Sequence, residues 1–140
     1  MICYAVIDTN VLVSALLSSH EDAATVQVLK YLFTGNMIPV YSDEILAEYN
    51  EVLRRKKFHF SEPLIIGLID TIIKFGVNIT PTPSSEIIPD MKDLPFYEVV
   101  MEMRTSEDAY LVTGNMKHFP EKPYIVTARH FLDILEEKHE

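Results

Sequence analysis

The sequence is poor in cysteine and in basic residues, and it has no long apolar run. Its 140 residues include a single cysteine, Cys3, which cannot form an internal disulfide. A chain of this kind is expected in a reducing compartment, here the cytoplasm. No apolar stretch approaches the ~20 residues of a membrane-spanning helix, and the start lacks the basic segment of a signal peptide. These absences argue against a secreted or membrane-embedded protein.

Positive charge is scarce, with 12 basic residues against 21 acidic ones and a net charge of −9. This balance argues against a general electrostatic attraction to nucleic acid, which depends on Lys and Arg at phosphates. The one dense cationic run is Arg54-Arg55-Lys56-Lys57. A solvated helix end, stabilised by the helix dipole, explains this run somewhat better than a patch that binds substrate.

The order of the expected elements predicts an α/β fold in a single domain that covers residues 1–140. Apolar runs predict five strands, at residues 2–7, 37–41, 77–79, 110–113 and 123–126. Helical patterns fill the intervals and the C-terminal segment, and the proline-rich stretch 80–89 is expected to be a loop. Strands that alternate with helices predict a mostly parallel sheet that is covered on both faces.

Ligand sites in such sheets lie beyond the carboxyl ends of the strands. This rule selects Asp8-Thr9-Asn10 after the first strand and Gly114-Asn115 after the strand that ends at Thr113. Taken alone, Asp8 is best explained as a helix N-cap. Its position at a strand end, followed by two polar residues, makes a metal or phosphate site a serious alternative.

Glu48 is expected at the boundary of the core. At about 100° per residue, Ile45, Tyr49 and Val52 define an apolar helix face, and Glu48 lies at the edge of that face. Glu44 and Glu51 point to solvent. A boundary carboxylate needs a partner, and the helical geometry does not discriminate between a metal and an Arg or Lys side chain.

Asp93 is expected just outside a helix. Pro95 suits a first helical turn and disfavours helical geometry at Leu94, so Leu94 is the expected cap residue. A capping role for Asp93 is therefore unnatural, which favours a functional role, whereas Asp90 is expected to be an ordinary loop acid.

Acids gathered at one sheet edge would raise one another's pKa unless a cation joined them. Mg²⁺ and Mn²⁺ favour oxygen ligands and keep water and phosphate as further ligands. Metals held in this way activate water and stabilise the leaving oxygen in phosphodiester cleavage.

Four segments, in order and over nearly the whole chain, resemble the motifs of the PIN-domain family. Residues 6–12 (VIDTNVL) are similar to the family's opening strand and first acid, and residues 45–49 (ILAEY) to its second-acid helix. Residues 93–98 (DLPFYE) resemble the third-acid segment, and residues 111–119 (LVTGNMKHF) the fourth motif. Each segment alone is a weak signal for the family, but four segments in this order are a specific one.

The resemblance implies a three-layer α/β/α fold with a central sheet of about five strands. It implies a ribonuclease that depends on Mg²⁺ or Mn²⁺ and cleaves RNA, often as the homodimeric toxin of a toxin–antitoxin pair, with an antitoxin protein as partner. By the same resemblance, the catalytic, metal-binding acids are Asp8, Glu48 and Asp93, and the supporting polar residues are Thr9, Asn10 and Thr113. The candidates for contact with substrate are Arg54, Arg55 and Lys117.

One position departs from the family pattern. Asn115 stands where the fourth acid is usual, and Asp108 precedes the expected strand and so lies at the wrong end to replace it. Asn115 can still offer an amide oxygen to a metal, but without charge, which predicts a weak nuclease with a high demand for metal. The alternatives are an RNA- or protein-binding module with little turnover on the same fold and, less favoured, a receiver-type signalling domain. The sequence contains no G-x-S-x-G motif of a serine hydrolase.

Overall fold

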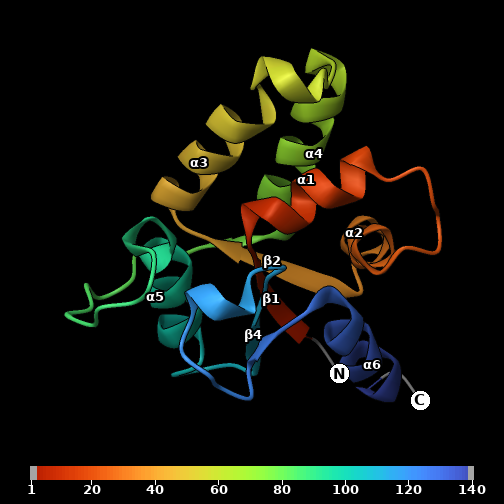
Figure 1. Ribbon diagram of the computed structural model, residues 1–140. Coiled ribbons are helices and arrows are strands. Elements are labelled where there is room, and N and C mark those ends of the chain that lie inside the picture. The colour runs from red at the N-terminus through yellow and green to blue at the C-terminus, as the bar shows by residue number, and fades with distance from the viewer. Residues whose placement is uncertain (1–2, 139–140) are drawn as a thin grey trace.

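Five short strands form one parallel sheet in the computed structural model, which describes residues 3–138 (Figure 1). The strands are β1 (Cys3–Ile7), β2 (Met37–Tyr41), β3 (Val77–Asn78), β4 (Ala109–Val112) and β5 (Ile125–Val126). Their order across the sheet is β3-β2-β1-β4-β5, and every pairing is parallel. The predicted parallel sheet is confirmed, and the predicted strand bounds differ from the observed ones by two residues at most.

Residues 3–138 form six helices around the sheet, namely α1 (Thr9–Leu17), α2 (Ala24–Thr34), α3 (Asp43–Leu53), α4 (Glu62–Phe75), α5 (Leu94–Met103) and α6 (Ala128–Lys138). The segments η1 (Lys56–Phe58), η2 (Met91–Asp93) and η3 (Met116–His118) are single turns of 3₁₀ helix. In Figure 1, α5 lies on one side of the strands, while α2 and α6 lie together on the other. The three-layer α/β/α arrangement is therefore as predicted. No helix within residues 3–138 is long and apolar enough to cross a membrane.

The local signals in the sequence act as expected at the helix ends. The Ser42 hydroxyl accepts a hydrogen bond from the Ile45 amide at 3.2 Å, so Ser42 caps α3. Helix α2 ends at its C-cap residue Gly35, which has a φ of 79°, a left-handed conformation that favours glycine. The end of α2 and the start of α3 are thus set by individual residues at those positions.

The core follows the periodicity of the sequence. Central strand β1 is buried on both faces, and Val6 within it is fully inaccessible to solvent. Helix α5 packs against β1, β2 and β4. Its apolar face is buried, with the side chains Phe96, Val99, Val100 and Met103. This packing fixes the start of α5 close to the carboxyl ends of the central strands.

The start of α5 differs from the prediction. Leu94 is helical, with φ −55° and ψ −39°, although Pro95 follows it, and Asp93 instead occupies the N-cap position. The reason is the preceding turn η2: the Asp90 carboxylate accepts from the Lys92 amide at 3.0 Å, and the Asp90 carbonyl accepts from the Asp93 amide at 3.0 Å. Asp90 therefore caps a turn that leads directly into α5, whereas the Asp93 side chain makes no capping bond.

Candidate active site

Strand register places Asp8 beside Thr113. Ile7 of β1 pairs with Val112 of β4, so the residues that follow them are neighbours at the carboxyl edge of the sheet. The Thr113 hydroxyl donates to Asp8 Oδ2 at 2.7 Å, and the Asn10 side-chain amide donates to the same oxygen at 3.1 Å. Asp8 is only 4% exposed and makes no capping bond to α1. Helix capping therefore does not explain this side chain.

The hydroxyl of Thr113 is oriented by its own loop. The backbone N–H of Asn115 donates to Thr113 Oγ1 at 2.9 Å, which leaves the hydroxyl hydrogen of Thr113 for Asp8. The backbone N–H of the preceding residue, Gly114, donates to Asn10 Oδ1 at 3.0 Å. A Cβ atom at Gly114 would lie 3.3 Å from that oxygen, so glycine allows the close approach. Asn10 thus joins the loops that follow β1 and β4.

Glu48 reaches this edge because of its neighbour Tyr49. Buried Tyr49 donates its hydroxyl to the carbonyl of Ile7, which fastens α3 to the end of β1. Glu48 is half-buried at the core boundary and accepts a hydrogen bond from the Thr9 hydroxyl. The polar partner of Glu48 is therefore a hydroxyl group next to Asp8.

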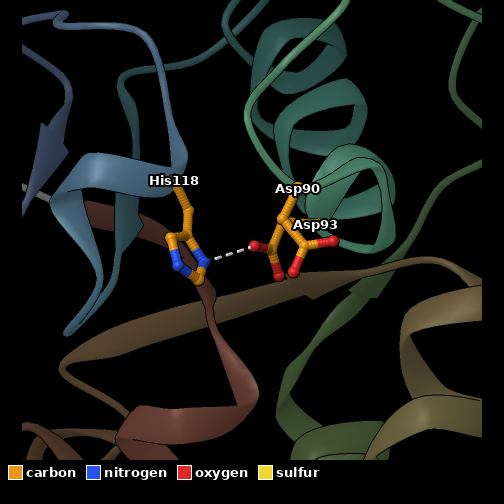
Figure 2. Close-up of side chains that lie close together, drawn as sticks. All are labelled: Asp90, Asp93 and His118. Carbon is orange, nitrogen blue, oxygen red and sulfur yellow. Dashed lines mark hydrogen bonds and ion pairs between the residues drawn. The ribbon is translucent and has the colours of Figure 1, made fainter.

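Asp93 lies at the start of α5, in its N-cap position. Its Oδ2 is 2.8 Å from Nδ1 of His118, which belongs to η3 (Figure 2). Ligand atoms of Asp90, Asp93 and His118 all lie within 4.8 Å of one another, and Asp8 and Glu48 do not belong to any group this compact within residues 3–138. From the sequence, Asp90 is expected to be a loop acid and His118 has no predicted role. The signal for His118 is its place three residues after Asn115 in the fourth motif.

The pKa values of the three carboxylates are all raised. Burial raises the pKa of Asp8 to about 6; the charges of Asp93 and Glu48 add to this effect, and the Thr113 hydroxyl opposes it. Burial, aided by the charge of Asp93, also raises the pKa of Glu48. The pKa of Asp93 is raised by burial and, to a lesser extent, by Asp90, while the hydrogen bond from His118 opposes the rise. Crowded oxygen donors of this kind fit a hard divalent cation.

Comparison with known proteins agrees with this geometry. The family model for the PIN domain matches residues 4–117. The chain belongs to the PIN domain family. No curated protein and no solved structure shows a significant match to it. PIN domains are generally nucleases, and the matched segment contains all the strand-end residues that surround Asp8.

Asn115 and Asp108 occupy different places in this PIN domain. Asn115 is exposed at the N-cap position of η3 without a side-chain capping bond, and it is the Asn115 peptide N–H that contacts the site. Asp108 lies at the amino end of β4, where it pairs with Lys138 and, at 3.7 Å, with Arg104. It is thus at the wrong end of the strand to replace a fourth acid.

The two candidate substrate-binding arginines of the PIN domain are engaged by glutamates. Arg54 Nε lies 2.8 Å from Glu62 Oε1, and the Arg55 guanidinium lies 3.0 Å from the Glu51 carboxylate. Both pairs are at the surface, as expected for a solvated helix end. Lys117 is exposed on η3, next to His118, and forms no ion pair with any residue between 3 and 138.

Proposed function

We propose that this PIN domain is a divalent-metal-dependent endoribonuclease in which Asp8, Glu48 and Asp93 hold Mg²⁺ or Mn²⁺. The observation that carries the proposal is the environment of Asp8. Its buried carboxylate is held by a hydroxyl and an amide, and its pKa is raised to about 6 by burial with help from the other two acids. A divalent cation bound between these acids would relieve the repulsion between their charges, and carboxylate oxygens are the ligands that such a cation prefers.

A bound cation of this type supplies an activated water and neutralises the charge that develops on the phosphate. The protein's part is to hold the ligands. Thr113 and Asn10 fix one oxygen of Asp8, Thr9 fixes Glu48, and His118 holds Asp93 through Nδ1. Hydrogen bonds to ligand side chains of this kind set their orientation and tune metal affinity.

We further propose that the protein is the toxin of a toxin–antitoxin pair and acts as a homodimer in the cytoplasm, with residues 1–140 as one PIN-like domain. The support is the resemblance of four motifs over nearly the whole chain, together with the single cysteine, which suits a reducing compartment. RNA is the proposed substrate, and an antitoxin protein is the proposed partner.

The direct test is cleavage of a single-stranded RNA by purified protein with Mn²⁺, with Mg²⁺ and with a chelator. We expect cleavage that requires the cation and disappears in Asp8→Asn. Cleavage that persists at full rate in the chelator, or in Asp8→Asn, would point to a contaminating nuclease and overturn the proposal.

A binding module without turnover is the second candidate, and Asn115 is the observation that favours it. This residue brings no charge to the strand end where the family pattern has an acid. If the protein binds RNA but does not cleave it at any Mn²⁺ concentration, the binding module is the better description.

A further inference from the structure

A groove of about 620 Å³ opens beside the candidate active site. At one end it is lined by Thr9 and Asn10, the residues that hold Glu48 and Asp8. The rest of its wall comes from α1, from the last turns of α3 and from η1, and is largely apolar, with Val13, Leu17, Val52 and Phe58. A ligand in this groove would therefore lie next to the proposed point of cleavage.

Exposed lysines directly precede Phe58, one of the residues that line this groove. Arg54 and Arg55 are neutralised by glutamates, but Lys56 and Lys57, the next two residues of the cationic run, are exposed. Neither lysine forms an ion pair with any residue that the structure describes. In a chain of net charge −9, two free cations beside an apolar groove favour a ligand that is itself anionic.

Aromatic rings accompany these lysines. Phe58 and Phe60 stack with ring centroids 5.6 Å apart and an interplanar angle of 15°, and Lys57 Nζ lies 5.1 Å from the centroid of Phe58. Between the two rings, His59 adopts a φ of 57° and is the one non-glycine residue within 3–138 with positive φ. His59 is the C-cap of η1 and donates its backbone N–H to the Lys56 carbonyl at 3.2 Å, so the left-handed turn ends η1 between the two rings.

We propose that this groove binds an unpaired nucleobase of the RNA substrate, which stacks on Phe58 while Lys56 and Lys57 contact the flanking phosphates. Aromatic side chains that interleave with cations bind single strands in this way, because every base offers a π-face and every nucleotide a negative charge. The inference rests on the proposed nuclease function and adds a binding site for one base of the RNA.

An apolar peptide segment of a protein partner is the competing occupant. A nucleobase is the favoured occupant for two reasons. Two exposed lysines directly precede Phe58, and Thr9 and Asn10 of the candidate active site line the same groove. A peptide would use the apolar wall equally well, but it would leave both cations without a counter-charge.

The chain contains a matched control for this site. Lys74 and Phe75, at the end of α4, form the same kind of pair, with Nζ 5.4 Å from the ring centroid, but they do not line the groove. We would measure binding of a fluorescent single-stranded RNA to full-length protein that also carries Asp8→Asn, so that the probe is not cut. Phe58→Ala should weaken binding roughly ten-fold, within the range for loss of a stacked base, whereas Phe75→Ala should not.

Two further comparisons separate stacking from charge and from misfolding. Phe58→Leu keeps the apolar volume and should bind as weakly as Phe58→Ala, while Phe58→Tyr should bind like Phe58. An RNA probe made of abasic nucleotides should not distinguish Phe58 from Phe58→Ala. Lys57→Ala should lower the salt dependence of binding by about 0.7 in slope, and Lys74→Ala should not.

The outcomes also separate this proposal from the nuclease proposal. If wild type cleaves RNA and Phe58→Leu binds RNA as tightly as wild type, the nuclease stands, the base site is wrong, and the groove is left to a peptide. If Phe58→Leu weakens RNA binding but wild type does not cleave with Mn²⁺, the base site stands and the nuclease is wrong. Equal losses in Phe58→Leu and Phe75→Ala would overturn the base site.

Discussion

Asp8 and Asp108 stand at opposite ends of the paired strands β1 and β4 and are held in opposite ways. At the amino end, Asp108 is exposed and paired with Lys138 and Arg104. At the carboxyl end, Asp8 is buried, and its neighbours are the hydroxyl of Thr113, the amide of Asn10 and two further acids whose charge it feels. Asp108 is therefore paired with cations of the protein, whereas Asp8 forms no ion pair with any residue in 3–138.

The comparison separates a structural acid from a functional one. A surface ion pair such as that of Asp108 contributes about 1 kcal/mol or less, and it needs nothing from outside the chain. A buried carboxylate among other carboxylates is unfavourable unless a cation is added or a proton is taken up. The environment of Asp8 is therefore better explained by a ligand than by the stability of the fold.

The largest expected difference between the two ends is their response to metal. Asp8→Asn should weaken Mn²⁺ binding by more than about 100-fold, because loss of a direct ligand exceeds the roughly 10- to 100-fold effect of losing a residue that supports a ligand. Asp108→Asn, the matched control, should leave metal binding unchanged. Thermal unfolding with and without Mn²⁺ measures both, since metal that binds only the folded state raises the melting temperature. An equal Mn²⁺-induced shift in wild type and Asp8→Asn would remove Asp8 from the site.

Stability of the metal-free protein should depend on pH through Asp8. Its pKa in the folded protein is raised from 3.8 to about 6, so the folded state favours the protonated form. The contribution of this group is fully present below pH ~4 and is lost as pH rises through about 6, a difference of roughly 3 kcal/mol. Urea unfolding in chelator should show this loss between pH 4.5 and pH 7 in wild type, with a smaller loss in Asp8→Asn. Parallel pH profiles of the two proteins would contradict the assignment.

Loss of the hydroxyl that supports Asp8 should have a smaller effect. Thr113→Val keeps the shape of a buried side chain but removes the 2.7 Å hydrogen bond to Asp8. We expect roughly 10- to 100-fold weaker Mn²⁺ binding, because this bond orients the ligand and favours its charged form. Thr113→Ser should restore most of the affinity. A Thr113→Val protein with wild-type affinity for Mn²⁺ would show that the hydroxyl serves the fold alone.

The smallest effect is expected at Asn115, where charge would be added instead of removed. In Asn115→Asp the new carboxylate should tighten Mn²⁺ binding by roughly ten-fold or more, since a carboxylate ~4 Å from a divalent ion contributes about 2 kcal/mol in water and more where solvent is excluded. The Mn²⁺ concentration needed for RNA cleavage should fall in parallel. Identical Mn²⁺ titrations of wild type and Asn115→Asp would place this side chain outside the site.

The sequence by itself determined the fold and the neighbourhood of Asp8. The alternation of apolar runs with helical patterns predicts the parallel sheet, and the rule that ligands lie at the carboxyl ends of strands points to Asp8-Thr9-Asn10 and Gly114-Asn115 without any family. Periodicity placed Glu48 at the core boundary. These features follow from local chemistry and from the pairing of short strands, which a single sequence records directly.

Only the tertiary structure decided what each acid contacts. Asp93 lies 25 positions from His118 in the chain, and their 2.8 Å contact depends on how α5 and the loop after β4 pack around the sheet. Leu94 is helical because η2 runs directly into α5, which overrides the preference of a residue before proline. Tyr49 reaches the carbonyl of Ile7 through the packing of α3 against α1, α5 and β2 and thereby sets Glu48 beside Thr9. Such contacts depend on distances between elements, and no local pattern of residues encodes those distances.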